Sequence, residues 1–147
     1  MKTERYTIFY TDDDVDDKEI FKEIINEISS GHSIEFQSDG VELLSLLNEK
    51  STKPDILFLD LNMPVKDGFQ VLNEIRQSPV NKDIPIVILS TSSDKDTITK
   101  AKDSGATLYL CKPNSYLELK SVLSELLNFN WKQNLTPQNL KDFVYYC

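Results

Sequence analysis

The middle of the chain reads Ile56-Leu57-Phe58-Leu59-Asp60, four apolar residues that end in an acid. A continuous apolar run of this length is typical of a parallel strand that is buried on both faces of its sheet. A loop follows, Asn62-Met63-Pro64-Val65-Lys66-Asp67-Gly68, and apolar residues then recur at helical spacing from Phe69 to Ile75. This stretch therefore predicts a strand, a loop and a helix, with Asp60 at the carboxyl end of the strand.

The same alternation recurs on both sides of this unit. Four further strands are predicted at Tyr6 to Thr11, Ser33 to Gln37, Ile84 to Leu89 and Leu108 to Cys111. Four further helices are marked by apolar positions from Ile20 to Ile28, from Val41 to Leu47, from Asp94 to Ser104 and from Leu117 to Leu127. Five strands that alternate with five helices predict an α/β fold, a parallel sheet covered by helices on both faces.

One helix of this pattern has a weak apolar face. The segment from Asp94 to Ser104 offers Ile98 and Ala101 as its clear apolar anchors, and Gly105 is a plausible C-cap. Burial of apolar area is what fixes a helix on a sheet. We therefore expect this helix to be held less firmly than its neighbours.

At 147 residues the chain has the length of one domain with a short extra segment. We assign residues 1–129 to the domain and residues 130–147 to a C-terminal tail, which contains Thr136-Pro137 as an N-cap and first-turn pair. A short helix is predicted there. We expect the aromatic residues from Trp131 to Tyr146 to pack on this domain or on a partner.

Composition excludes several classes of function. A net charge of −8 and a pI near 4.6 oppose binding to nucleic acid, and no apolar run approaches the length of a membrane span, so we expect a cytoplasmic protein. Cys111 and Cys147 do not form a disulfide framework, and we interpret both as reduced thiols. His32, the single histidine, is interpreted as a solvated loop residue without a partner for zinc or catalysis.

Polar residues collect where the predicted strands end. Asp12-Asp13, Asp60, Ser90 and Lys112 each follow a different strand, and ligands of open parallel sheets bind at this edge. Two carboxylates about 4 Å apart repel by roughly 4 kcal/mol at an effective dielectric constant near 20. Three acids at one edge therefore favour a bound cation, and Mg²⁺ is the cation that suits oxygen ligands and phosphate.

These groups are suited to a carboxylate that accepts a phosphoryl group, with Asp60 as the acceptor. Ser90 can donate a hydrogen bond to the phosphoryl group and Lys112 can supply a positive charge. Each element also has a plainer interpretation: Asp14, Asp16 and Asp17 cap a helix, the serines after Leu89 form an N-cap cluster, and Lys112-Pro113 is a turn. Their occurrence together in this order favours the phosphoryl site.

From about residue 4 to residue 128 the sequence resembles the response-regulator receiver domain. The resemblance rests on Asp12-Asp13, the segment from Phe58 to Gly68, Ser90-Thr91, Gly105-Ala106 and the segment Tyr109-Leu110-Cys111-Lys112-Pro113. It implies a doubly wound, flavodoxin-like fold with five strands in the order 2-1-3-4-5. It also implies a signalling protein of a two-component phosphorelay and not an enzyme with a turnover of its own.

The resemblance implies a role for each site residue. Asp60 is phosphorylated by a histidine kinase or a histidine phosphotransfer protein, and Mg²⁺ is held by Asp13, Asp60 and the main-chain carbonyl of Asn62, with Asp12 acting through water. Ser90 and Lys112 contact the phosphoryl group, Ser90 and Tyr109 form the switch, and Lys112-Pro113 is a cis bond. A downstream protein binds the face made by the fourth helix, fifth strand and fifth helix.

Thr91 and Thr11 depart from the family pattern, in which alanine and an aliphatic residue are frequent. Thr91 and Asn62 are therefore expected to tune dephosphorylation. The segment after Phe129 is too short to form an output domain, so we expect a stand-alone receiver. Two alternatives remain: a small Mg²⁺-dependent phosphatase with an aspartyl-phosphate intermediate, whose nucleophile follows the first strand as an Asp-x-Asp pair, and a receiver fold used without phosphorylation as an interaction module.

Overall fold

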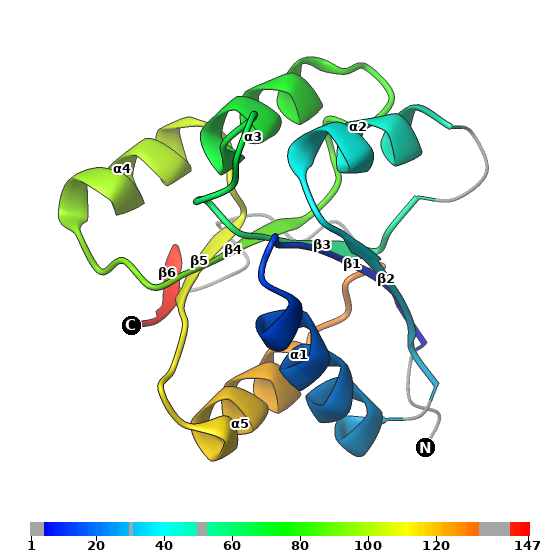
Figure 1. Ribbon diagram of the computed structural model, residues 1–147, viewed down its shortest axis with the longest axis vertical. Helices are drawn as coiled ribbons and strands as arrows, with labels where there is room; N and C mark the ends of the chain where they lie inside the picture. The colour runs from blue at the N-terminus through cyan, green and yellow to red at the C-terminus, as the bar shows by residue number, and fades with distance from the viewer. Residues whose placement is uncertain (1–4, 30, 50–52, 133–141) are drawn as a thin grey trace.

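The computed structural model describes residues 5–29, 31–49, 53–132 and 142–147 (Figure 1). The strands are β1 (Thr7–Thr11), β2 (Ser33–Gln37), β3 (Ile56–Leu59), β4 (Ile86–Ser90), β5 (Leu108–Cys111) and β6 (Val144–Tyr146). The helices are α1 (Val15–Ile28), α2 (Gly40–Asn48), α3 (Gly68–Gln77), α4 (Lys95–Asp103) and α5 (Tyr116–Leu126). Each of the five predicted strands and five predicted helices of the domain is present.

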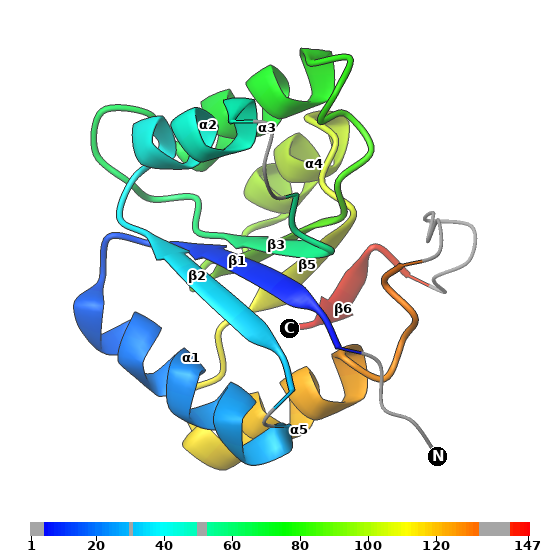
Figure 2. The same cartoon turned by 90° about the vertical axis from the view of Figure 1, so that its right-hand side faces the viewer.

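The strands form one parallel sheet in the order β2-β1-β3-β4-β5-β6. The predicted order 2-1-3-4-5 is confirmed, and β6 extends the sheet beyond β5. Helices α1 and α5 cover one face, whereas α2, α3 and α4 cover the other (Figures 1 and 2). Because β1 and β3 are adjacent strands, Asp12 and Asp60 leave the sheet side by side.

Strand β3 is buried on both faces, as its apolar run predicts. Phe58 packs in the cluster beneath α1 and α5, whereas Leu57 and Leu59 pack in the cluster beneath α2, α3 and α4. All four residues of β3 have 0% exposure. Successive side chains of a strand point to opposite faces, so this alternation fixes the strand and with it the position of Asp60.

Helix α4 has little apolar burial. It begins after Asp94, whose side chain accepts a hydrogen bond from Thr97 N, and Ala101 is its fully buried residue. Ile98 is partly buried against the same cluster. Gly105 has φ +104°, a left-handed conformation that suits glycine after a helix end. The two predicted apolar anchors are confirmed, and the weak hold of α4 stays a prediction.

The C-terminal tail differs from the prediction. Val144–Tyr146 form strand β6, so the predicted helix is wrong for these residues, whereas Thr136-Pro137 and Leu140 lie outside the described residues. Aromatic and β-branched residues suit a strand. Strand β5 would otherwise expose its unpaired backbone groups at the sheet edge, and β6 covers them.

The expectation that the tail packs through its aromatic residues is confirmed for the described part. Trp131 has 2% exposure, and its indole N–H donates to Leu126 O at 2.9 Å. Tyr145 and Tyr146 pack against the cluster beneath α1 and α5. The tail therefore belongs to the packed body of the molecule at both of its described ends.

Two single-residue expectations are corrected. Cys111 and Cys147 are joined in a disulfide, because the pairing of β5 with β6 brings their Cα atoms to 4.7 Å. His32 is half-buried, stacks on Tyr6 and accepts a hydrogen bond from Tyr6 N at 3.0 Å through Nδ1, so it is not simply solvated. Within the described residues no helix is long and apolar enough to cross a membrane.

Candidate functional site

Parallel strand ends bring the predicted site residues to one edge of the sheet. Asp60 N donates to Thr11 O at 3.0 Å, which places the Asp60 backbone beside the end of β1. Lys112 N donates to Ser90 O at 2.7 Å, which places Lys112 beside the end of β4. The order β1-β3-β4-β5 therefore assembles groups that are as much as 100 residues apart in sequence.

Three carboxylates form a cluster at this edge. One oxygen each from Asp12, Asp13 and Asp60 lies within 4.8 Å of the others, and these oxygens suit a metal ion. Asp12 and Asp60 have 1% and 6% exposure, whereas Asp13 is exposed. The cluster is thus buried on the side of the sheet and open toward solvent at Asp13.

Asp12 is held by hydrogen bonds that sequence reasoning did not assign. Tyr10 donates its hydroxyl to Asp12 Oδ2 at 2.6 Å, and Asp14 N donates to Asp12 Oδ1 at 2.9 Å. Burial, and then the Asp12 carboxylate, raise the pKa of Tyr10 far above its ordinary value, so the phenol stays protonated and keeps donating. Tyr10 therefore fixes Asp12 from within the core.

Lys112 faces three carboxylates. Its Nζ lies 2.8 Å from Asp17 Oδ2, 3.1 Å from Asp12 Oδ2 and 3.8 Å from Asp60 Oδ1. Burial alone would lower the pKa of Lys112, but the hydrogen bond with Asp17 and the charges of Asp60 and Asp12 hold it above its usual value. The ammonium is therefore charged and shared among these acids.

Asp17 is the site residue that sequence reasoning missed. The acidic run after β1 indicated helix capping, and Asp14 does cap α1 by accepting from Asp17 N at 3.0 Å. The carboxylate of Asp17 instead reaches across to Lys112. Asp17 lies in the first turn of α1, directly after the N-cap Asp14, whereas Asp13 precedes the helix.

Asp60 is an unusual carboxyl group. Burial raises its pKa to about 7, the Lys112 charge opposes this rise, and the Asp12 and Asp13 charges add to it. The backbone N–H of Asn62 donates to the carboxylate and lowers the pKa. A buried carboxylate between two like charges and one ammonium is a group that a cation or a phosphoryl donor can engage.

The loop after β3 packs Gly68 against the backbone of Asp60 and Leu61. Gly68 N donates to Leu61 O at 2.9 Å, and a Cβ at Gly68 would lie 2.7 Å from Asp60 O and 2.8 Å from Leu61 Cα. Only a residue without a side chain fits this approach. The N-terminus of α3, with Asp67 and Gln70 in a capping box, is thereby packed directly against the Asp60 backbone.

A family model supports the same assignment. The model described as "Response regulator receiver domain" matches residues 8–124. The chain belongs to the response regulator receiver family. It is a signalling domain, and its acidic site is typical of the phosphorylation pocket of these receivers.

Individual receivers resemble this one over most of its length. Response regulator Rcp1 of Synechocystis is 30% identical over 134 residues, which cover 88% of this chain and 90% of that protein. A probable C4-dicarboxylate response regulator, DctR of Priestia megaterium, is 26% identical over 99% of this chain and 64% of its own length. The similarity thus includes receivers that are part of longer proteins.

Solved receiver structures share this fold. The phosphorylated cyanobacterial phytochrome response regulator RcpA has a TM-score of 0.81 at 30% identity and covers 90% of this chain and 98% of its own. The Mn²⁺-bound form of Rcp1 has a TM-score of 0.77 at 30% identity, with coverage of 89% and 97%. These receivers confirm the flavodoxin-like order of the first five strands.

The remaining predicted site residues of this receiver lie around the cluster. Ser90 is fully buried, and its hydroxyl accepts a hydrogen bond from Ser92 N at 3.1 Å. Thr91 and Asn62 are exposed in the loops after β4 and β3. Tyr109 has 0% exposure, and its hydroxyl donates to Ser92 O at 2.7 Å.

One predicted backbone feature is corrected. The Lys112–Pro113 peptide was expected to be cis, but every peptide bond among the described residues is trans. Lys112 nevertheless reaches the acidic cluster, because its backbone is hydrogen-bonded to Ser90 and its side chain extends along the strand ends.

Proposed function

We propose that Asp60 of this receiver accepts a phosphoryl group from the phosphohistidine of a histidine kinase or a histidine phosphotransfer protein. One observation carries the proposal: Asp60 is almost fully buried, lies in a cluster with two further carboxylates, and has an ammonium 3.8 Å from its Oδ1. In the transfer an Asp60 oxygen bonds to phosphorus as the bond from phosphorus to the histidine nitrogen breaks.

We further propose Mg²⁺ as the cofactor, held by Asp13, Asp60 and the main-chain carbonyl of Asn62, with Asp12 acting through water. The residues fit such an ion, because three carboxylates offer oxygen ligands within 4.8 Å of one another and Asp13 leaves the site open. The Mn²⁺-bound form of the related Rcp1 supports a divalent cation. When bound, Mg²⁺ would neutralise charge on the phosphoryl oxygens.

Lys112 and Ser90 are proposed to contact the phosphoryl group. Lys112 already lies between Asp12 and Asp60, so a short movement away from Asp17 brings its ammonium to a phosphoryl oxygen on Asp60. The Ser90 hydroxyl would turn from Ser92 N toward the same group. These contacts exist only after phosphorylation, and contacts that differ between two states shift the population between them.

Thr91 and Asn62 are proposed to tune the lifetime of the phosphoryl group. Both are exposed, on the loops that directly follow β4 and β3. A side chain at these positions controls how water approaches the phosphorus atom. Thr91, larger than the alanine frequent in the family, is expected to slow hydrolysis, and Thr91→Ala to speed it.

We propose that the signal leaves through the face of α4, β5 and α5, with Ser90 and Tyr109 as the switch. Tyr109 lies in β5 and is tied to the loop that leads from Ser90 into α4 through its bond to Ser92 O. A shift of Ser90 would therefore reach Tyr109 and the weakly anchored α4. Beryllofluoride, a phosphoryl mimic, should change the NMR shifts of α4 and Tyr109; changes confined to the neighbours of Asp60 would contradict this switch.

The proposed partners are proteins. The net charge of −8 opposes a nucleic-acid surface, and no membrane association is proposed. We propose a cytoplasmic location, where histidine kinases present their phosphohistidine. The downstream protein is not identified by any contact in the molecule.

Intact mass tests the acceptor directly. The protein is incubated with acetyl phosphate and Mg²⁺ and compared with Asp60→Asn under the same conditions. We expect the mass of one phosphoryl group to be added to the wild type and none to the variant. Equal labelling of both proteins would place the phosphoryl group elsewhere.

A p-nitrophenyl phosphate assay beside the labelling experiment separates the two alternatives. A phosphatase would turn over p-nitrophenyl phosphate rapidly, whereas a receiver is labelled stoichiometrically and loses the group slowly. An interaction module would not be labelled at all. The nucleophile of such phosphatases follows the first strand, whereas Asp60 follows β3, which favours the receiver.

A further inference from the structure

The chain's own C-terminus occupies the edge of β5. Strand β6 pairs in parallel with β5, with Tyr109 opposite Val144 and Leu110 opposite Tyr146. Tyr109 N donates to Phe143 O at 2.9 Å, and the rings of Tyr109 and Phe143 lie 6.3 Å apart. The residue proposed as the switch is therefore covered by the tail.

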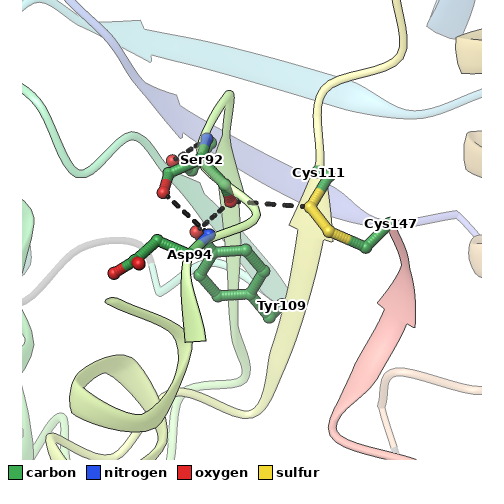
Figure 3. Close-up of a disulfide and its surroundings, with 6 residues drawn as sticks. Ser92, Asp94, Tyr109, Cys111 and Cys147 are labelled. Atoms are coloured by element: carbon green, nitrogen blue, oxygen red, sulfur yellow. Dashed lines mark hydrogen bonds between the residues drawn. A yellow bond between two sulfur atoms is a disulfide. The ribbon is translucent and has the colours of Figure 1, made fainter. Parts of the chain in front are cut away.

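A disulfide closes this arrangement. Cys111, the last residue of β5, is joined to Cys147, the last residue of the chain (Figure 3). Cys147 is exposed, whereas Cys111 has 9% exposure. One sulfur of the bond is therefore accessible to a thiol from solvent, and Cys111 is adjacent to Lys112 of the acidic site.

The Ser92 carbonyl lies beside both the disulfide and the hydroxyl of the switch residue. Cys111 Sγ lies 3.5 Å from Ser92 O, the same carbonyl that accepts the Tyr109 hydroxyl at 2.7 Å. Figure 3 shows the Ser92 carbonyl oxygen joined by dashed lines to the Tyr109 hydroxyl and to the Cys111 sulfur. A reduced Cys111 would have an S–H group that can donate to this carbonyl, so the reduced state also has a satisfied partner.

Apart from β5, strand β6 contacts the cluster beneath α1 and α5 through Tyr145 and Tyr146, and the rings of Tyr145 and Phe129 lie 5.9 Å apart. Its three residues are all half-buried, and the Tyr146 hydroxyl donates to Glu118 Oε2 on α5 at 2.8 Å. A strand of three residues at a sheet edge buries little apolar area, so it opens easily unless it is tied down. The disulfide supplies that tie.

We propose that Cys111 and Cys147 form a reversible dithiol–disulfide site that fastens β6 over Tyr109 when oxidised and releases it when reduced. Reversibility rests on the proposed cytoplasmic location, because disulfides in reducing compartments are usually transient and redox-sensing. The reaction partner is a small thiol or a protein dithiol, together with its disulfide form. The site gives the output face an input that is independent of phosphorylation.

The exchange balances in two steps. A thiolate of the partner attacks the exposed Cys147 sulfur, forms a mixed disulfide with it, and Cys111 leaves as a thiolate that takes up a proton. A second partner thiolate then attacks the partner sulfur, giving the partner disulfide and a Cys147 thiolate that is protonated. Two electrons pass from the partner to the protein, and oxidation follows the same steps in reverse.

Hydrogen exchange on the full chain tests the release of β6. Protein equilibrated with oxidised glutathione is compared with protein equilibrated with reduced glutathione, and intact mass reports the gain of two hydrogens on reduction. We expect the amides of Tyr145, Tyr146 and Cys147 to exchange about tenfold faster or more in the reduced protein. The amides of β1 and β3 serve as the internal control and should not change.

Cys147→Ser provides the matched variant. It keeps the size of the side chain and removes the bond, so it should exchange like the reduced wild type in either buffer. Equal protection of β6 in both redox states, a bond that the glutathione couple does not reduce, or a disulfide that forms only between chains would each overturn the proposal. No readout involves phosphate, so a failure to phosphorylate Asp60 would leave this result unaffected.

Discussion

The Lys112 ammonium lies 2.8 Å from Asp17 Oδ2, closer than it lies to either acid of the cluster that it faces. Lys112 is thus paired with Asp17 on α1, whereas the proposed phosphoryl group would form on Asp60, directly after β3. On the function proposed above, phosphorylation of Asp60 would require the ammonium to leave Asp17, and Asp17 would therefore restrain the reaction.

Replacing Asp17 should therefore speed phosphorylation. In Asp17→Asn the ammonium is released toward Asp60, and one negative charge that repels an anionic donor is removed. We expect the rate of labelling by acetyl phosphate to rise roughly 2- to 10-fold. Asp16→Asn removes the same charge from an exposed position on α1 and is the control. An equal gain in both variants would attribute the effect to net charge and not to Lys112.

Repulsion within the cluster should destabilise the metal-free protein. Folding raises the pKa of Asp60 from 3.8 to about 7, so the folded state binds this proton more tightly than the unfolded state. The stability that results is fully present below about pH 4 and is lost as the pH rises through about 7. Asp60→Asn carries no such charge. At pH 8 without Mg²⁺ we expect the variant to be roughly 1 to 4 kcal/mol more stable than the wild type.

Chemical denaturation at two pH values measures this difference. At about pH 3 the two proteins should unfold at nearly the same denaturant concentration, because Asp60 is then mostly neutral in both the folded and the unfolded wild type. Added Mg²⁺ should stabilise the wild type at pH 8 and have less effect on the variant. A variant less stable than the wild type at pH 8 would contradict the repulsion.

Removal of Asp13 should nearly abolish Mg²⁺ binding. Its carboxylate is the exposed member of the cluster, and few protein ligands hold Mg²⁺, so losing one should lower the affinity more than about tenfold. Calorimetric titration of Asp13→Ala measures the loss, with Asp16→Ala as the control. An unchanged affinity in Asp13→Ala would remove the metal from this position.

A side chain at Gly68 should displace the Asp60 loop. The Cβ of Gly68→Ala would meet backbone atoms of Asp60 and Leu61 at 2.7 and 2.8 Å, so the loop must move. We expect a loss of about 1 to 3 kcal/mol in the free energy of unfolding, together with slower labelling of Asp60. Gly31→Ala is the control, because its Cβ would meet only the Arg5 side chain, at 3.2 Å. Equal stability of both variants would show that the loop tolerates the displacement.

Much of this fold was readable from local pattern. Each helix of the domain was marked by its apolar spacing, and the apolar run from Ile56 to Leu59 identified a strand buried on both faces. Parallel strand ends meet at one edge, so Asp12, Asp13, Asp60 and Lys112 were predicted to lie together, and the structure places them there.

Tertiary structure decided what depends on distant partners. The acidic run after β1 indicates only helix capping, and the pairing of Asp17 with Lys112 appears when the start of α1 and the end of β5, 95 residues apart in sequence, meet at one edge of the sheet. The sequence of the tail was compatible with a helix. A short aromatic segment does not reveal that the edge of β5 is unpaired and can accept a further strand. Pairing of β6 with β5 then brought Cys147 to Cys111, a proximity that no spacing in the sequence encodes.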